Sequence, residues 1–216
     1  MAYLGLETIR RGTSADCIRD IFTLHFPTAK KVLDATYGSG RFWGWDHYLD
    51  IVGVDCDPPV PCTVKADYRK LPFANSSCDV LVFDPPFIFS RGIQRVIGTK
   101  RFFRGAEHVE PEERTYANMP IQKAKNPRAL LVHYQSLFAQ RHIATQGMIV
   151  KGQDLVTSVR RDWWSFHIYN LAMEMGMGEP ADILLQYSRA SRMKDPRWKQ
   201  QRMFRAAHCS YIVWKW

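Results

Sequence analysis

The sequence predicts an α/β protein with a doubly wound, mostly parallel sheet of seven strands, the last of them antiparallel. Short runs that are apolar on both faces alternate with helical stretches, as in a parallel sheet covered by helices on both sides. The last two runs are joined without the signal of a crossover-length helix, which indicates an antiparallel last strand. The 216 residues, 46% of them hydrophobic, suffice for a single domain with a sizeable core over residues 1–216.

Each predicted element is bounded by residues that favour turns or helix ends. The expected strands are 31–35, 51–55, 63–67, 79–83, 146–152, 181–187 and 209–216. The expected helices are 13–26, 41–48, 129–140 and 163–175. The first helix has Ser14 as its predicted N-cap and ends before Pro27, and the last ends at Gly176 and Gly178.

Two segments, at about 88–128 and 189–207, break this pattern and are predicted to be basic loop insertions. There are nine basic and four acidic residues between Ile88 and Leu130, and seven basic and one acidic between Arg189 and Arg205, in a chain of net charge +9. Such clustering predicts phosphate contacts with a nucleic acid, and a solvated charged surface is the alternative. The residues expected to bind nucleic acid are Arg91, Arg95, Lys100, Arg101, Arg104, Arg192, Lys194, Arg197, Lys199 and Arg202.

Several classes of protein are disfavoured by composition. No apolar run approaches 18 residues and the first residues lack an apolar signal core, so we expect neither a membrane span nor secretion. The five cysteines and seven histidines are scattered without metal-ligand spacing. We therefore expect a cytoplasmic protein with reduced thiols and no metal site.

Carboxylates stand at the ends of four predicted strands: Asp34, Asp55, Asp67 and Asp84. In doubly wound sheets, ligands bind outside the carboxyl ends of the strands, so the site is expected there. Asp57 competes with Asp55 as a ligand-binding residue, or serves as a turn residue before Pro58.

A glycine turn, Gly38-Ser39-Gly40, follows the first of these strands. Glycines let a backbone approach a ligand closely, and a following helix N-terminus would suit a nucleotide-like molecule. The third glycine of the dinucleotide fingerprint is replaced by Trp43, whose ring disfavours NAD binding. A tight structural turn is the alternative interpretation.

Two prolines follow the carboxylate at the end of the fourth predicted strand, in the run Asp84-Pro85-Pro86-Phe87. Prolines fix the backbone and remove N–H donors, leaving carbonyl groups as acceptors. The Asp84 carboxylate and the Pro85 carbonyl then form a rigid pair of acceptors that fits the two hydrogens of an exocyclic NH₂ group. Phe87 offers a flat apolar face on which a base can stack. An ordinary turn after a strand is the bland alternative.

Taken in order, these motifs resemble the S-adenosylmethionine-dependent amino-methyltransferases of nucleic acids. The matching runs are Asp34-x-x-x-Gly38-Ser39-Gly40, Gly53-Val54-Asp55, Ala66-Asp67 with Leu71-Pro72-Phe73, and Asp79-x-x-x-x-Asp84-Pro85-Pro86-Phe87. The resemblance implies a Rossmann-like class I methyltransferase fold. Its D-P-P-F box is typical of methylation at an exocyclic nitrogen, most often N6 of adenine, and also occurs in ribosomal RNA guanine-N2 enzymes.

The resemblance also implies roles for individual residues. Asp34 and the glycine turn would hold the methionine part of the cofactor, Asp55 its ribose and Asp67 its adenine. The D-P-P-F box, Asp84 to Phe87, would surround the target base as the catalytic set. The cofactor set so implied is Asp34, Ala35, Thr36, Tyr37, Gly38, Gly40, Asp55, Cys56, Asp67, Tyr68 and Asp84. The sequence departs from the common adenine-enzyme pattern at Ala35-Thr36-Tyr37, where Pro-Phe is usual, and at Arg41.

The expected function is methylation of adenine N6 in DNA with S-adenosyl-L-methionine as cofactor. The alternatives are an RNA methyltransferase acting on adenine N6 or guanine N2, and a non-catalytic nucleic-acid-binding partner. Recognition would fall to the two basic loops or to a second copy of the chain in a homodimer. Cys62 is interpreted as structural, because the D-P-P-F box occupies the strand end where a carbon-5 enzyme would need its nucleophile. The run Lys151-Gly152-Gln153-Asp154, which ends the fifth strand, is expected to help wall the base pocket.

Overall fold

The computed structural model describes residues 5–45, 48–56, 61–85, 131–156, 161–187 and 208–216. Both predicted basic loops lie outside these residues, as do Pro86, Phe87 and Asp57. The predicted nucleic-acid contacts outside them are Arg91, Arg95, Lys100, Arg101, Arg104, Arg192, Lys194, Arg197, Lys199 and Arg202.

An eight-stranded mixed sheet forms the centre of the protein, in the order β1-β9-β10-β6-β5-β2-β3-β4. The last strand, β10, is antiparallel to both neighbours, and every other neighbouring pair in this sheet is parallel. The α/β class and the antiparallel last strand are therefore confirmed, whereas the predicted count of seven strands is wrong. The strands are β1 (Ile9–Arg11), β2 (Lys31–Asp34), β3 (Asp50–Asp55), β4 (Val64–Lys65), β5 (Cys78–Phe83), β6 (Ala144–Gly152), β9 (Asp182–Tyr187) and β10 (His208–Lys215).

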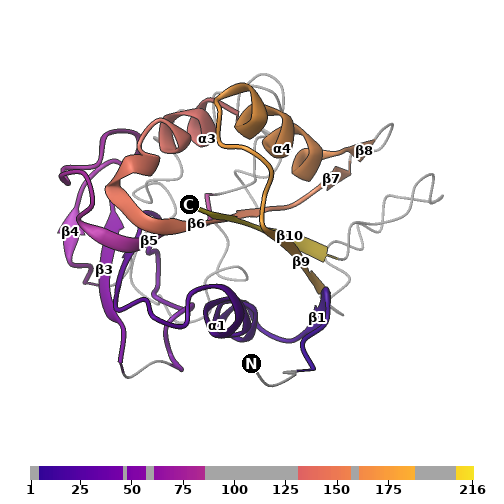
Figure 1. Cartoon of the computed structure of the whole chain (residues 1–216), viewed down its shortest axis with the longest axis horizontal. Coiled ribbons are helices and arrows are strands. Elements are labelled where there is room, and N and C mark those ends of the chain that lie inside the picture. The colour runs from indigo at the N-terminus through magenta and orange to yellow at the C-terminus, as the bar shows by residue number, and fades with distance from the viewer. Residues whose placement is uncertain (1–4, 46–47, 57–60, 86–130, 157–160, 188–207) are drawn as a thin grey trace, which may run out of the picture.

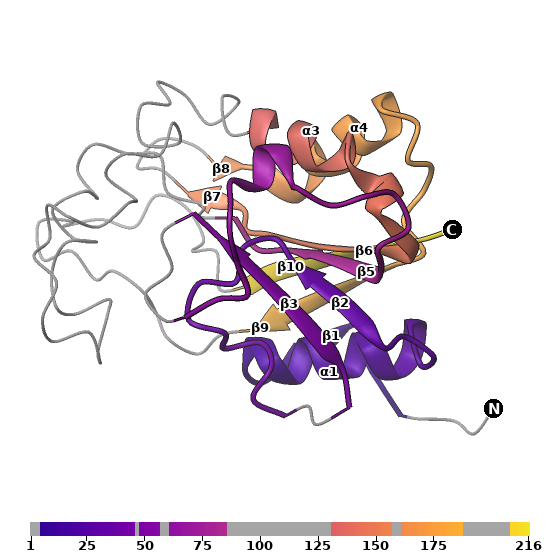
Figure 2. The same cartoon turned by 90° about the vertical axis from the view of Figure 1, so that its left-hand side faces the viewer.

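Helices cover both faces of this sheet, which makes three layers (Figures 1 and 2). Helix α1 (Ser14–His25) lies on one face, and α3 (Leu131–Phe138) and α4 (Trp164–Glu174) lie together on the other. Two 3₁₀ turns, η1 (Tyr68–Lys70) and η5 (Arg141–Ile143), lie on the same side as α3. Because helices flank it on both sides, the centre of the sheet is apolar on both faces.

Strand β5 shows how the sequence builds two cores from one strand. Side chains alternate between the faces of a strand with a period of two. Leu81 and Phe83 therefore join the core under α3 and α4, whereas Val80 and Val82 join the core under α1. All four side chains are at most 1% exposed. Burying such a side chain stabilises the fold by about 1.5–3 kcal/mol, so β5 is a strong organising element.

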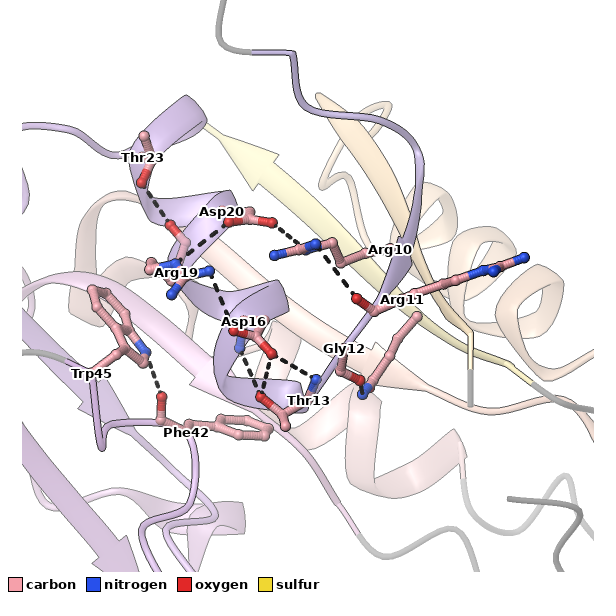
Figure 3. A network of polar contacts seen from close by, with 11 residues as sticks. Arg10, Arg11, Gly12, Thr13, Asp16, Arg19, Asp20, Thr23, Phe42 and Trp45 are labelled. Carbon is pink, nitrogen blue, oxygen red and sulfur yellow. Dashed lines mark hydrogen bonds and ion pairs between the residues drawn. The ribbon is translucent and has the colours of Figure 1, made fainter. Parts of the chain in front are cut away.

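Helix α1 begins with a capping box (Figure 3). The Thr13 hydroxyl accepts a hydrogen bond from the Asp16 amide at 3.2 Å, and the Asp16 carboxylate accepts one from the Thr13 amide at 2.8 Å. The predicted N-cap, Ser14, is therefore wrong by one residue. Thr13 is the better cap because it stands three residues before a carboxylate that can bond back to it.

The predicted helix at 41–48 is wrong over residues 41–45, which form turns. Phe42 and Trp43 are adjacent, yet both are only 8% exposed. Both rings pack in the core that α1 covers. Aromatic residues and Gly44 also have weak helix propensity. The β2–β3 connection therefore packs as an aromatic loop on the α1 face.

Two elements carry no sequence signal that predicts them. Strand β1 lies at the sheet edge, pairs Ile9 with Leu185 of β9, and consists of one isoleucine and two arginines. Charged residues are common on edge strands and give no apolar pattern. A separate two-stranded pair, β7 (Leu155–Val156) with β8 (Arg161–Asp162), is shorter still, with two residues in each strand.

Candidate functional site

The strand register brings three of the predicted carboxylates to one edge of the sheet. Asp34, the last residue of β2, pairs with Gly53 of β3 on one side and with Val82 of β5 on the other. Asp55 and Asp84 each come two residues after these partners, so they lie just beyond Asp34 at the carboxyl ends of the strands. This is the edge at which the sequence places the site.

Backbone and side-chain hydrogen bonds tie the glycine turn to both neighbouring strands. The Tyr37 amide donates to the Val54 carbonyl at 3.0 Å, and the Gly38 amide donates to the Asp55 carboxylate at 2.9 Å. On the other side, the Asp84 amide donates to the Thr36 hydroxyl at 2.7 Å. The turn therefore links the predicted cofactor residues to the first residue of the D-P-P-F box.

The conformation of the turn requires glycine at its end. Gly40 has a φ of +67°, in the left-handed region that favours glycine. A Cβ there would also lie 2.7 Å from the Tyr37 hydroxyl. The Tyr37 ring itself lies over Gly53, where a Cβ would come within 2.5 Å of it. Tyr37, one of the departures from the common family pattern, is accommodated by these two glycines.

Asp34 is the buried centre of this edge, with only 2% exposure. Its carboxylate accepts hydrogen bonds from the Thr36 amide at 3.0 Å and from the Trp43 indole nitrogen at 2.8 Å. Burial raises the pKa of Asp34 to about 7. The two hydrogen bonds oppose this shift, and the charges of Asp84 and Asp55 add to it. Three carboxylates therefore influence one another at this edge.

Asp84 is half-buried and makes an ion pair with Lys151 of β6. The Lys151 ammonium lies 2.8 Å from Oδ2 of Asp84. Pro85, the second residue of the box, is buried. The backbone amide of Asp84 thus bonds to Thr36 of the turn, and its carboxylate contacts a cation from the neighbouring strand.

The other predicted cofactor residues have local structural contacts. Asp67 caps η1 through the Arg69 amide at 2.8 Å and forms an ion pair with the Arg69 guanidinium. Hydrogen bonding from Arg69 lowers the pKa of Asp67. Tyr68 is 5% exposed, and its hydroxyl lies 2.5 Å from Nδ1 of His133. Cys56, directly after β3, is partly exposed.

Burial and position give these residues different access to a ligand at the carboxyl edge. Tyr68 packs in the core under α3, where its ring contacts Phe83. Ala35 is buried, and its amide donates to the Val82 carbonyl at 2.9 Å. Thr36, Gly38 and Asp55 are all partly exposed beside the glycine turn. The structure thus brings together the turn, Asp55 and Asp84, and places Tyr68 away from them in the core.

Two residues of this edge have contacts that sequence reasoning did not predict. Trp43 was identified only as a substitute for a glycine, yet its indole nitrogen satisfies the buried Asp34 carboxylate. Lys151, in the run predicted to wall the base pocket, contacts Asp84 directly. The sequence signal for Lys151 is its place directly after the apolar run Met148-Ile149-Val150.

No protein-family model and no curated protein matches this chain. In the described part of the chain, no group of three His, Cys, Asp or Glu side chains could hold a metal ion. No helix among those same residues has the length and apolar character to span a membrane.

Proposed function

We propose that this chain is an S-adenosyl-L-methionine-dependent methyltransferase that acts on an exocyclic amino nitrogen of a nucleobase, N6 of adenine in DNA. The observation that carries the proposal is the 2.7 Å hydrogen bond from the Asp84 amide to the Thr36 hydroxyl. It joins the residue proposed to hold the base to the turn proposed to hold the cofactor. Methyl transfer needs these two sites in contact, because the two reacting atoms must meet.

The strand order supports a Rossmann-like fold for this proposal. Strand β2 lies between β3 and β5, so the chain leaves β2 on one side and later returns on the other. Such a reversal is the switch point at which doubly wound folds bind their ligands. Asp34 of β2 and Asp84 after β5 flank that point. Strand β1 is an addition at the far edge of the sheet and does not alter the order around the switch point.

The charges at the carboxyl edge fit a positively charged cofactor. S-adenosyl-L-methionine supplies a methyl group that is activated by its bond to a positively charged sulfur. Burial raises the pKa of Asp34, and the nearby carboxylates of Asp84 and Asp55 raise it further. A cation relieves that repulsion. Asp34, Asp55 and the glycine turn would hold the cofactor, with Thr36 connecting the turn to Asp84.

The D-P-P-F box would act by orienting the amino group of the base. An amine on an aromatic ring is a weak nucleophile because its lone pair is delocalised into the ring. Hydrogen bonds from both N–H groups to the Asp84 carboxylate and the Pro85 carbonyl favour a pyramidal nitrogen with a directed lone pair. Such alignment contributes about 7–11 kcal/mol to lowering a barrier. The nitrogen would gain the methyl group as the methyl–sulfur bond of the cofactor breaks, which leaves a neutral thioether. It would lose one proton, for which the partly exposed Asp84 carboxylate is an adjacent acceptor.

The proposal is tested by labelled methyl transfer from S-adenosyl-L-methionine to duplex DNA, single-stranded DNA and total RNA. Digestion to nucleosides and mass spectrometry then identify the product. We expect N6-methyladenine in DNA, and we expect Asp84→Ala to retain less than about a tenth of the rate while still binding the cofactor. Label in RNA alone would reassign the substrate. Cofactor binding without transfer to any of the three would contradict an enzymatic role.

A further inference from the structure

We propose that Lys151 is a positioning residue that fixes the orientation of the Asp84 carboxylate. The inference rests on the proposed function, because it assigns to Lys151 the task of presenting Asp84 to a substrate amino group. Lys151 lies one strand away from the D-P-P-F box. It acts through Asp84, with which its ammonium makes the contact described above.

The sheet register explains why these two side chains meet. Phe83 of β5 pairs with Val150 of β6, so the next residues of the two parallel strands, Asp84 and Lys151, lie side by side. Side chains two residues apart on a strand share a face, so both project toward the α1 face, on which Val82 is buried. The pairing of the two strands alone therefore places the Asp84 and Lys151 side chains next to each other.

The Asp84–Lys151 pair is more sheltered than the arginine–aspartate pairs of the described residues. The Lys151 and Asp84 side chains are 11% and 22% exposed, whereas Arg10, Arg19 and Arg69 in their ion pairs are each 37% exposed or more. A sheltered pair is expensive to desolvate and adds little stability compared with apolar residues of the same size. Its presence at the carboxyl edge is better explained by function than by folding.

Three side chains besides Asp84 contact the Lys151 ammonium. It lies 5.3 Å from the ring centre of Phe42 and 5.6 Å from that of Tyr211, within the range of cation–π attraction. It also donates to the Ser14 hydroxyl of α1 at 3.4 Å. Ser14 in turn donates to the Gln186 side chain of β9 at 3.3 Å. The ammonium is thus fixed by contacts independent of Asp84.

A second set of hydrogen bonds holds Gln186. Its side-chain oxygen accepts from the Tyr211 hydroxyl at 3.0 Å, and its side-chain nitrogen donates to the Gly12 carbonyl at 2.9 Å. Gly12 directly follows β1, the edge strand that the sequence did not predict. The network therefore connects Asp84 through Lys151 to the junction of β1 and α1.

The hydrogen bond from Lys151 to Oδ2 of Asp84 also sets the directions of the remaining acceptor positions of the carboxylate. An ionised carboxylate has about four acceptor positions, and the ammonium at Oδ2 uses one of them. The pair is charge-assisted, so it restricts rotation of the carboxylate more than a neutral hydrogen bond would. The remaining positions then face in fixed directions, as an acceptor for a substrate amino group requires.

The test compares Lys151→Met, Lys151→Arg and the matched control Lys215→Met, an exposed lysine at the end of β10 in the same sheet. We expect Lys151→Met to lower kcat by about 10²-fold, since small misplacements at a reacting centre have effects of that size. The KM for nucleic acid and the Kd for S-adenosyl-L-methionine should stay within about twofold. Lys151→Arg should recover part of kcat, and Lys215→Met should match the wild type.

A full kcat in Lys151→Met, or equal losses in kcat and cofactor affinity, would overturn the inference. A double-mutant cycle on thermal unfolding with Asp84→Asn separates it from the proposed function. We expect the Tm of the double variant to exceed the additive value by about 3 °C or more, because each single variant leaves a sheltered charge without its partner. Wild-type protein without methyl transfer would overturn the proposed function, and the cycle would still decide whether Lys151 holds Asp84. Additive Tm losses would overturn the inference.

Discussion

The two ends of strand β5 each carry an aspartate, and the two carboxylates are held in opposite ways. Asp79, near the amino end, accepts hydrogen bonds from the amides of Lys30 and Lys31 at 2.7 and 2.9 Å. Asp84, at the carboxyl end, pairs with a side-chain ammonium, and its backbone amide bonds to the glycine turn. Asp79 thus links β5 to the start of β2 through backbone amides, whereas Asp84 links it to β6 through the Lys151 side chain.

The difference separates a structural carboxylate from a candidate functional one. At Asp79, partial burial raises the pKa, but hydrogen bonds led by those from the Lys31 and Lys30 amides outweigh it and lower the pKa. Backbone donors are supplied by the fold and cannot be exchanged for a ligand. At Asp84, the partner is a side chain that leaves acceptor positions for a ligand. The same residue type therefore anchors a strand at one end and, in our proposal, binds substrate at the other.

The sharpest way to break this comparison is to replace each aspartate by asparagine. We expect Asp84→Asn to lower the methyl-transfer rate by about 10²–10³-fold, because an oriented acceptor is lost where charge develops. Asp79→Asn should keep the wild-type rate at a temperature where it is folded. Single-turnover rates with saturating cofactor measure both. Equal losses in the two variants would show that the carboxyl end has no special role.

The second largest expected effect is a pH dependence of cofactor affinity that is caused by Asp34 at the carboxyl edge of the sheet. Because Asp34 has a pKa of about 7, it is mostly neutral at pH 6 and mostly ionised at pH 8. A cation binds the ionised form better, so affinity should rise with pH by up to about tenfold per unit below 7 and level off above it. Titration calorimetry with S-adenosyl-L-methionine measures this. Asp34→Asn should flatten the rise, and affinity that falls as pH increases would contradict the assignment.

The amino end should show its effect in stability. Asp79→Ala leaves two backbone amides without their carboxylate, so we expect a loss of about 1–2 kcal/mol in the free energy of unfolding at pH 7. The lowered pKa means that this contribution is present above the unfolded-state pKa near 3.8 and disappears as pH falls through the lower folded-state value. Denaturant unfolding at pH 7 and pH 3 tests this, and a difference that grows in acid would contradict it.

A third carboxylate, Asp16 in the capping box, should behave like Asp79 with a smaller effect. Hydrogen bonds from the Thr13 amide and hydroxyl lower the pKa of Asp16. Thr13→Ala should reduce the free energy of unfolding by about 1 kcal/mol. Cofactor affinity should not change. A large loss of affinity with normal stability would instead place this helix start in the binding site.

Much of the sheet could be predicted because its strands are short apolar runs buried on both faces, as in β5 and β10. The failures have local physical causes. Strand β1 is charged and lies at an edge, so nothing in its sequence separates it from a loop. The stretch 41–45 has the length of a helical turn, but its aromatic residues and Gly44 have weak helix propensity, and it packs as turns on the α1 face. Tertiary packing therefore decided the conformation of residues 41–45 against the predicted helix.

The candidate site divides in the same manner. The carboxyl ends of β2, β3 and β5 could be predicted because an aspartate that directly follows an apolar run is a local sequence pattern. The ion pair of Lys151 with Asp84 depends on β6 lying beside β5, which local sequence does not encode. The hydrogen bond from Trp43 to Asp34 depends on a loop folding back across the end of β2. The sequence thus indicates which residues lie at this edge, but it does not indicate the contacts that Lys151 and Trp43 make with them.

The account is tested most directly by a crystal structure with bound S-adenosylhomocysteine, the product form of the cofactor. We predict that the ligand lies along the turn at Gly38 and Gly40, with its sulfur facing the Asp84 carboxylate. A ligand that binds elsewhere, or whose sulfur faces away from residue 84, would contradict the claim that cofactor and base meet at the carboxyl end of β5.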